Sequence, residues 1–289
     1  MSSMRRTVAA ALAIVLGFTM APGLAEDDYV EAMAREHADD APVAAAADGA
    51  PAGGISGKAV DYGPGTGYLA VPPDEVRGGL VVIHEWWGLN DNIREMSNRL
   101  AAEGYLALAV DLYEGEVAAE PGEARELMSA LMDDPERIES HLRAAHAWLR
   151  EDGEAATVAS IGWCLGGALS LRLAMMLPEE LDAAVISYGR VVTDPERLAP
   201  LMMPILGIFG GQDRGIPVES VLEFEGLLDT LGKTAEIVIY EDADHAFANP
   251  SGTRYEPEAA EDAWRRTLSF LEEHLQRGPL EELVEEVID

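Results

Sequence analysis

The stretch 157–168 constrains the fold of this chain more than any other. A short apolar run ends in Gly162, the chain's only cysteine, Cys164, lies two positions later, and Gly166 another two positions on. This Gly-x-Cys-x-Gly pattern is typical of a nucleophile elbow, in which a reactive side chain sits in a sharp turn between a strand and a helix. Side chains two positions on either side of the nucleophile would collide there, and glycine removes those collisions.

The elbow predicts a reactive thiol at Cys164. The turn places this residue at the start of a helix predicted over 168–177, where the positive end of the helix dipole stabilises a thiolate and lowers the thiol pKa. The backbone N–H of Leu165, the next residue, is predicted to be one donor of an oxyanion hole. The alternative is a buried structural cysteine, which is the usual fate of an unpaired cysteine.

Size and charge limit the class of protein. The chain has 289 residues, of which 48% are hydrophobic, which suits one large α/β domain or two small ones. Its net charge of −33 argues against nucleic acid or an anionic membrane surface as a partner, because both need basic patches. One cysteine allows no internal disulfide bond.

Residues 1–25 predict an export signal. The basic pair Arg5 and Arg6 precedes an apolar run, Val8–Met20, and small residues lead up to Ala25. This order predicts cleavage after Ala25 and export to a bacterial periplasm or beyond. The apolar run is short for a membrane span, so no stable span is expected after processing; an uncleaved anchor is the alternative.

The rest of the chain divides into three parts. Residues 26–54 are rich in Ala, Asp and Gly and are predicted to be a flexible linker, with a helical turn around 29–36 and a solvated His37. Residues 55–276 alternate apolar strands with amphipathic helices, which predicts an α/β domain with a mostly parallel sheet and helices on both faces. Residues 277–289 form an acidic tail. The predicted elements are an edge hairpin over 60–71, strands over 80–84, 105–110, 157–161, 183–187, 205–209 and 236–240, and helices over 90–102, 123–132, 135–150, 168–177, 218–231 and 258–275.

Two polar residues follow late strands of the predicted sheet, and active sites of parallel sheets gather at the carboxyl ends of strands. Asp213 comes after one strand and His245 after the next. The chain order is therefore nucleophile, acid, histidine, which is the order of the α/β-hydrolase fold. A thiol needs a base to take its proton, and the base needs a carboxylate to orient it. Asp111 is the competing acid, but it precedes the nucleophile and is predicted to make structural hydrogen bonds instead.

The first long strand ends in the sequence His-Glu-Trp-Trp-Gly, residues 84–88. In this fold the loop at that place supplies the second backbone N–H of the oxyanion hole, which we assign to Trp86. Glu85 has no role in a plain serine triad, but a carboxylate near a thiol raises the thiol pKa or accepts its proton. Trp86 and Trp87 either pack in the core or wall an apolar substrate pocket.

Several separated motifs resemble the dienelactone hydrolase family of the α/β-hydrolase superfamily. They lie at 84–90, 111–113, 162–167, 211–213 and 244–248, and the resemblance covers roughly 55–275. It implies an α/β-hydrolase fold and hydrolysis of esters or lactones by Cys164, His245 and Asp213, with Glu85 contacting the resting thiol. The residues predicted to line the substrate pocket are Trp87, Tyr113, Trp163, Phe247 and Asn249.

The sequence departs from this family at two positions. Members that act on dienelactone hold the substrate carboxylate with two arginines, whereas Gly115 and Asn249 stand at the matching places here, with Glu114 and Glu116 beside the first. The expected substrate is therefore a small, uncharged ester or lactone. No metal and no organic cofactor is indicated. The competing hypothesis is a non-catalytic or redox-responsive thiol protein on a hydrolase fold.

Overall fold

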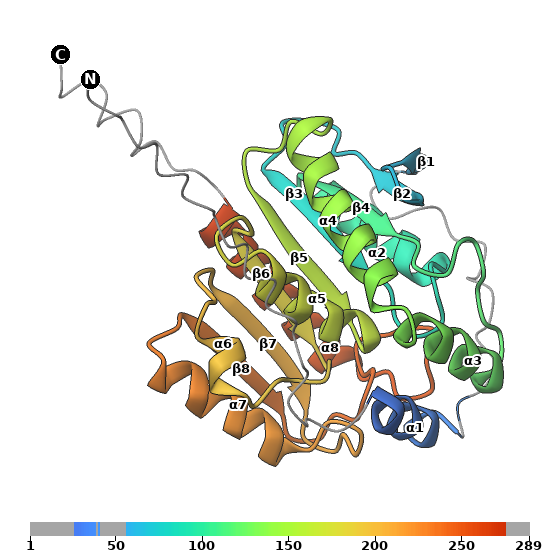
Figure 1. Ribbon diagram of the computed structural model, residues 1–289, viewed down its shortest axis with the longest axis vertical. Coiled ribbons are helices and arrows are strands. Elements are labelled where there is room, and N and C mark those ends of the chain that lie inside the picture. Colours follow the sequence, from blue (N-terminus) through green and yellow to red (C-terminus); the bar gives the residue numbers. More distant parts are fainter. Residues whose placement is uncertain (1–25, 39, 41–55, 276–289) are drawn as a thin grey trace, which may run out of the picture.

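A computed structural model describes residues 26–38, 40 and 56–275. The predicted export signal, most of the predicted linker and the acidic tail lie outside these residues. The described chain forms one eight-stranded sheet with the order β1-β2-β4-β3-β5-β6-β7-β8 (Figure 1). The strands are β1 (Lys58–Asp61), β2 (Thr66–Ala70), β3 (Gly78–Ile83), β4 (Tyr105–Val110), β5 (Val158–Trp163), β6 (Ala183–Ser187), β7 (Ile205–Gly210) and β8 (Ala235–Tyr240).

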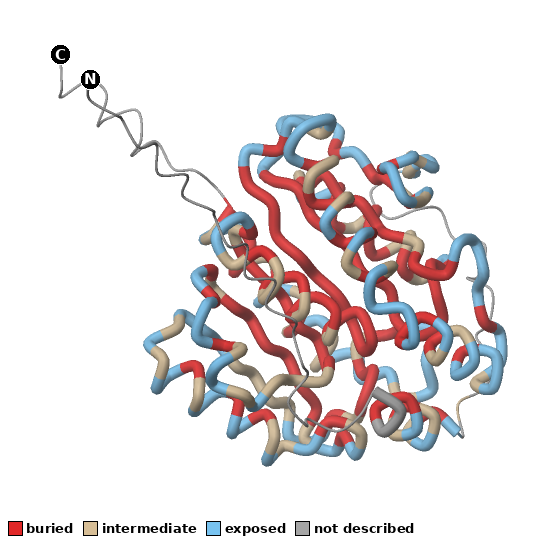
Figure 2. Tube along the Cα trace, in the orientation of Figure 1, coloured by how far each residue is buried: buried red, intermediate tan, exposed pale blue. Residues whose placement is uncertain are grey.

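The sheet is mostly parallel, as predicted. Strands β3 to β8 pair in parallel, and the antiparallel pair β1 and β2 forms the edge hairpin beside β4. Every residue of β3, β4, β5, β6 and β7 is buried, which explains why these strands read as continuous apolar runs. Figure 2 shows this buried centre beneath an exposed outer layer.

Helices cover both faces of the sheet, with α4 and α5 in front of it and α8 behind it in Figure 1. Among the described residues, none of the helices is both long and apolar enough to cross a membrane. The helices are α1 (Glu26–Glu36), α2 (Asp91–Ala102), α3 (Pro121–Met132), α4 (Pro135–Glu151), α5 (Leu165–Met176), α6 (Pro195–Leu198), α7 (Val218–Thr230) and α8 (Pro257–Leu275).

Helix α5 begins three residues earlier than predicted, at Leu165 rather than at 168. Gly166 and Gly167, which led to the prediction of a later start, lie inside the first turn of the helix. A Cβ atom on Gly166 would lie 2.2 Å from the Ile83 carbonyl oxygen, and one on Gly167 would lie 2.6 Å from the Ser187 carbonyl oxygen. These glycines therefore allow the helix to pack closely on the strands β3 and β6.

The N-terminal segment differs most from expectation. Residues 26–36 form three turns of helix, α1, rather than one turn in a linker. Tyr29, Val30 and Met33 are buried on one face of α1, which packs against α3 (Figure 1). His37, expected to be solvated, is only 1% exposed. The composition of this segment did not predict a full helix, because its apolar face has only three large side chains among alanines and acidic residues.

Candidate active site

Cys164 lies in a strained turn between β5 and α5, as the elbow pattern predicted. Its backbone has φ 56° and ψ −119°, a conformation that residues with side chains rarely adopt. A Cβ atom at Gly162 would lie 2.1 Å from the Gly166 carbonyl oxygen. The two glycines are therefore required by the close approach of the backbone on either side of the cysteine.

His245 and Asp213 form a buried hydrogen-bonded pair at the ends of β8 and β7. His245 Nδ1 lies 2.7 Å from Asp213 Oδ2. The other carboxylate oxygen, Oδ1, accepts from the backbone N–H groups of Gly215 (2.9 Å) and Ile216 (2.8 Å), so the carboxylate is held in place. Asp244 accepts from the backbone N–H of His245. The structure therefore brings the predicted base and its orienting acid together beside the elbow.

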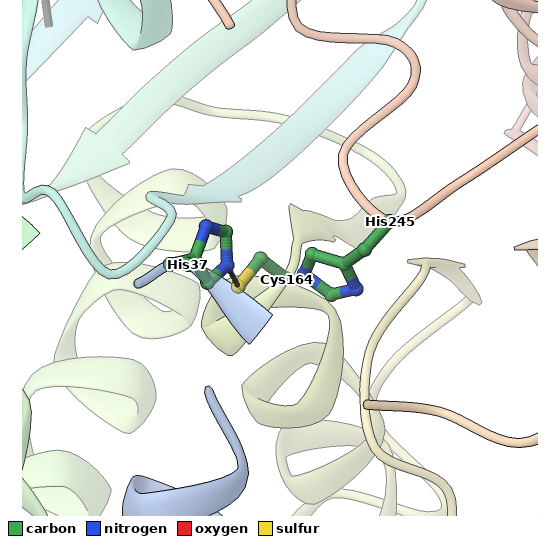
Figure 3. Close-up of side chains that lie close together, drawn as sticks. All are labelled: His37, Cys164 and His245. Atoms are coloured by element: carbon green, nitrogen blue, oxygen red, sulfur yellow. Dashed lines mark hydrogen bonds between the residues drawn. The ribbon is translucent and has the colours of Figure 1, made fainter. Parts of the chain in front are cut away.

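A second histidine, His37, contacts the thiol. Its Nε2 lies 3.8 Å from Cys164 Sγ, and Met33 Sδ lies 3.9 Å from the same sulfur. Figure 3 shows the cysteine between the rings of His37 and His245. The His37 ring packs on Trp86, with 4.4 Å between ring centroids. The sequence held one weak signal for this contact, since Met33 and His37 are four residues apart and so share one side of a helical path.

The charges around Cys164 favour its thiolate. Burial disfavours ionisation, but the positive charges on His245 and His37 outweigh it and lower the pKa of Cys164 to about 6. For His245, burial alone would lower the pKa. The negative charges of Asp213 and the thiolate outweigh burial and raise the His245 pKa well above its usual value. A thiolate beside a protonated imidazole is the resting state expected of an activated cysteine nucleophile.

The rate of Cys164 alkylation by iodoacetamide should follow this ionisation. Because the thiolate is the reactive form, we expect the rate to rise with pH through a midpoint near 6. His245→Ala removes the charge that lowers the Cys164 pKa most while burial persists, so the midpoint should move upward, to about 8.5 or above. His274→Ala, on α8, should leave the midpoint unchanged. An unchanged midpoint in His245→Ala would show that the thiol and His245 are not coupled.

Glu85 is buried near the thiol and bonded to Asn249. Asn249 Nδ2 donates to Glu85 Oε2 at 2.5 Å, and Asn249 Oδ1 accepts from Ser251. Burial and the nearby charge of Cys164 raise the pKa of Glu85 to about 7. The structure thus places the Asn249 amide on the carboxylate, and its side chain is held by two neighbours.

The residues predicted to line one substrate pocket lie in different parts of the structure. Trp87 lines a depression together with His37 and Asn249. Trp163 lines a different depression, bounded by α2 and α8, so its side chain is not brought to the thiol. Phe247 packs between Tyr188 and Tyr240.

Two predicted residues support the loop after β3. The Tyr113 hydroxyl donates to the Trp86 carbonyl oxygen at 3.1 Å and so fixes the segment that carries the predicted oxyanion donor. Asp111 accepts from the backbone N–H groups of Tyr113 and Gly115, which confirms that it is structural. Tyr113 therefore acts on the site through Trp86.

Access to the thiol depends on the segment that carries His37. Cys164 and His245 are fully buried, and the depression nearest to them is lined by His37, Trp87 and Arg254. Arg254 holds the segment, because its guanidinium donates to the Glu36 carbonyl oxygen at 2.7 Å and lies 3.2 Å from the Asp40 carboxylate. His37, just after α1, thus lines this depression on one side and contacts the thiol on the other.

Arg254→Ala is expected to speed Cys164 alkylation at a fixed pH. Loss of a partly exposed ion pair of this kind costs about 1 kcal/mol, which corresponds to roughly fivefold more of the open state. Arg265→Ala removes an ion pair on the exposed face of α8 and is the matched control. Equal alkylation rates in the wild type and Arg254→Ala would show that this contact does not control access.

Known proteins share this architecture. A model of the dienelactone hydrolase family matches residues 66–275. A Saccharolobus solfataricus protein, provisionally named a carboxymethylenebutenolidase, is 33% identical over 247 residues, which cover 71% of this chain and 92% of that protein. A crystal structure from Klebsiella pneumoniae subsp. pneumoniae, provisionally named a dienelactone hydrolase, is 30% identical with a TM-score of 0.66 and covers 74% of this chain and 97% of that one. The dienelactone hydrolase structure from Anabaena variabilis, 24% identical with a TM-score of 0.61, covers 77% of this chain and 99% of that one and shows the same fold.

Proposed function

Because this chain belongs to the dienelactone hydrolase family, with the α/β-hydrolase fold, we propose that it is an exported cysteine hydrolase of carboxylic esters or lactones. One observation carries the proposed mechanism. The chain's only thiol stands in a strained elbow beside a histidine whose other ring nitrogen is bonded to a buried carboxylate.

In the first half of the reaction, the Cys164 thiolate attacks the carbonyl carbon of the ester. The carbonyl oxygen becomes negative, and the backbone N–H groups of Leu165 and Trp86 stabilise it. Leu165 opens α5, so its N–H has no partner within the helix. Protonated His245 then gives its proton to the leaving alkoxide, and an acyl-thioester remains.

In the second half, neutral His245 takes a proton from water, and the hydroxide attacks the thioester. The carboxylic acid leaves and the thiolate is restored beside the protonated imidazole. Asp213 keeps the Nδ1 proton in place throughout, so that Nε2 is the nitrogen that exchanges protons. Glu85, with its pKa near 7, is the second buried group able to exchange a proton with the resting thiol.

The charges of the site favour an uncharged substrate. Glu85 lies near the nucleophile, and Arg254, which lines the depression beside His37, is already paired with Glu36 and Asp40. Glu114 and Glu116 are exposed beside Gly115. We therefore expect a higher kcat/KM for neutral phenyl acetate than for its carboxylated analogue, with a ratio of about 10 or more, since one uncompensated charge contact costs more than about 1.4 kcal/mol. A preference for the anionic ester would contradict the proposed substrate class.

Export rests on residues 1–25 and is tested separately. Mass spectrometry of the protein recovered from the producing cells should show a chain that begins at Glu26. An intact N-terminus on a membrane-bound product would support the anchor instead. If the thiol proves inert at every pH, the non-catalytic alternative is favoured over the hydrolase.

A further inference from the structure

Three buried donor groups converge at the bottom of the closed site. One ring nitrogen of His37, one of His245 and the Cys164 sulfur all lie within 4.8 Å of one another (Figure 3). They come from the turn after α1, the loop after β8 and the elbow, so only the folded chain brings them together. Thiolate and imidazole are both good ligands for late transition metals.

Both histidines are oriented as metal-bound histidines are. His245 Nδ1 lies 2.7 Å from Asp213 Oδ2, and His37 Nδ1 lies 2.6 Å from Asp40 Oδ2. Arg254 Nη2 also lies 2.9 Å from His37 Nδ1. A carboxylate on one ring nitrogen fixes the other as the metal ligand. The Nε2 atom of His245 is buried and makes no hydrogen bond within the described part of the chain, which leaves it open to a ligand.

The distances suit a single ion. Donors about 2.0–2.3 Å from a shared ion, at trigonal angles, lie about 3.5–3.8 Å apart. The Cys164 sulfur and His37 Nε2 are already 3.8 Å apart. Because no pair of the three atoms exceeds 4.8 Å, closing on an ion needs a shift of about 1 Å. Met33 Sδ, 3.9 Å from the thiol sulfur, adds a thioether to the same centre.

We propose that Cys164, His37 and His245 bind one Cu(I) ion, with the Met33 thioether as a fourth and weaker donor. Thiolate and thioether sulfur select Cu(I), whereas Zn(II) in proteins is held by thiolate, imidazole, carboxylate or water. Copper enters and stays as Cu(I). The resting site already holds a thiolate, so binding displaces the proton of the His245 imidazolium to solvent and frees Nε2 for the ion; nothing is oxidised or reduced.

The bound ion would act on both the chemistry and the fold. It occupies the sulfur and the imidazole nitrogen, so the copper-bound form does not hydrolyse esters. It also joins the α1 segment to the elbow and the β8 loop through three bonds. The proposal depends on the donor atoms rather than on the hydrolase activity, and it can hold even if no ester is cleaved.

The test is a titration of the reduced full chain, without oxygen, with Cu(I) supplied as its coloured bicinchoninate complex. We expect transfer of one Cu(I) per chain from the chelator. His37→Gln and Cys164→Ser each remove one ligand at similar size and should abolish the transfer. Asp40→Asn removes only the carboxylate behind His37 and should weaken binding about 10- to 100-fold. His274→Ala, on α8, should bind like the wild type.

Three outcomes would overturn the proposal. They are no transfer to the wild type, equal Cu(I) affinity in His37→Gln and the wild type, or tighter binding of Zn(II) than of Cu(I). Circular dichroism of each variant identifies any loss of fold. Met33→Leu keeps the apolar volume and removes only the thioether, so it should bind Cu(I) more weakly without unfolding. Cu(I) should also protect Cys164 from alkylation in the wild type but not in His37→Gln.

Discussion

Cys164→Ala is expected to lower kcat/KM for phenyl acetate by roughly 10⁴-fold or more, the loss typical when a covalent nucleophile is removed. The cysteine is fully buried, has a positive φ of 56° that residues with side chains rarely adopt, and is the chain's only thiol. Removal of one sulfur atom leaves a small cavity and costs about 1 kcal/mol of stability, so the variant should still fold. The measurement is steady-state hydrolysis, with a thermal melt to show that the fold is intact.

Cys164→Ser is the matched variant, since it keeps the size of the side chain and changes only the ionisation of the nucleophile. Its hydroxyl is not ionised beside His245, so we expect a rate between those of the wild type and the alanine variant. If Cys164→Ala retained wild-type activity, the proposed nucleophile would be wrong. If both variants and the wild type were inactive on a broad set of neutral esters, the non-catalytic alternative would gain support.

Most of the fold was predictable because its elements are specified locally. Strand β4 has the predicted bounds, and α2 begins within one residue of its predicted start, where Asn90 Oδ1 accepts from the Ile93 N–H. Buried parallel strands leave a continuous apolar run in the sequence, and capped amphipathic helices leave a period of 3.6. The short helix α6 was missed, because four residues are too few to show a period.

The meeting of Cys164, Asp213 and His245 was predictable because it follows from strand order. Cys164, Asp213 and His245 each follow a strand, and parallel pairing brings those three ends to one edge of the sheet. Side-chain direction at that edge was not predictable. Trp163 and Asn249 belong to the expected motifs, yet Trp163 lines a depression between α2 and α8, whereas Asn249 both lines the depression beside His37 and binds Glu85.

The role of His37 could not be predicted from the sequence. It lies 127 residues before the thiol, and no spacing rule links the two. Its place depends on three buried apolar residues of α1 and on ion pairs to Arg254, all of which are tertiary contacts. An acidic, alanine-rich composition is equally compatible with a solvated linker. The burial of His37 and its contact with the thiol are therefore visible only in the structure.

Asp213→Asn should lower kcat/KM by about 10³- to 10⁴-fold while leaving the fold intact. The backbone N–H groups of Gly215 and Ile216 require an acceptor at Oδ1, so the new amide must place its oxygen there and its NH₂ group toward His245 Nδ1. His245 would then have to accept at Nδ1 and carry its proton on Nε2, which is the wrong tautomer for a base that faces the thiol. Asp244→Asn is the matched control, since the Asp244 carboxylate accepts from the backbone N–H of His245 and not from its ring, and its loss should cost less than about tenfold. Equal losses of kcat/KM in the two variants would show that Asp213 does not orient the base. A rise of the pH midpoint of Cys164 alkylation in Asp213→Asn, but not in Asp244→Asn, would show that it does.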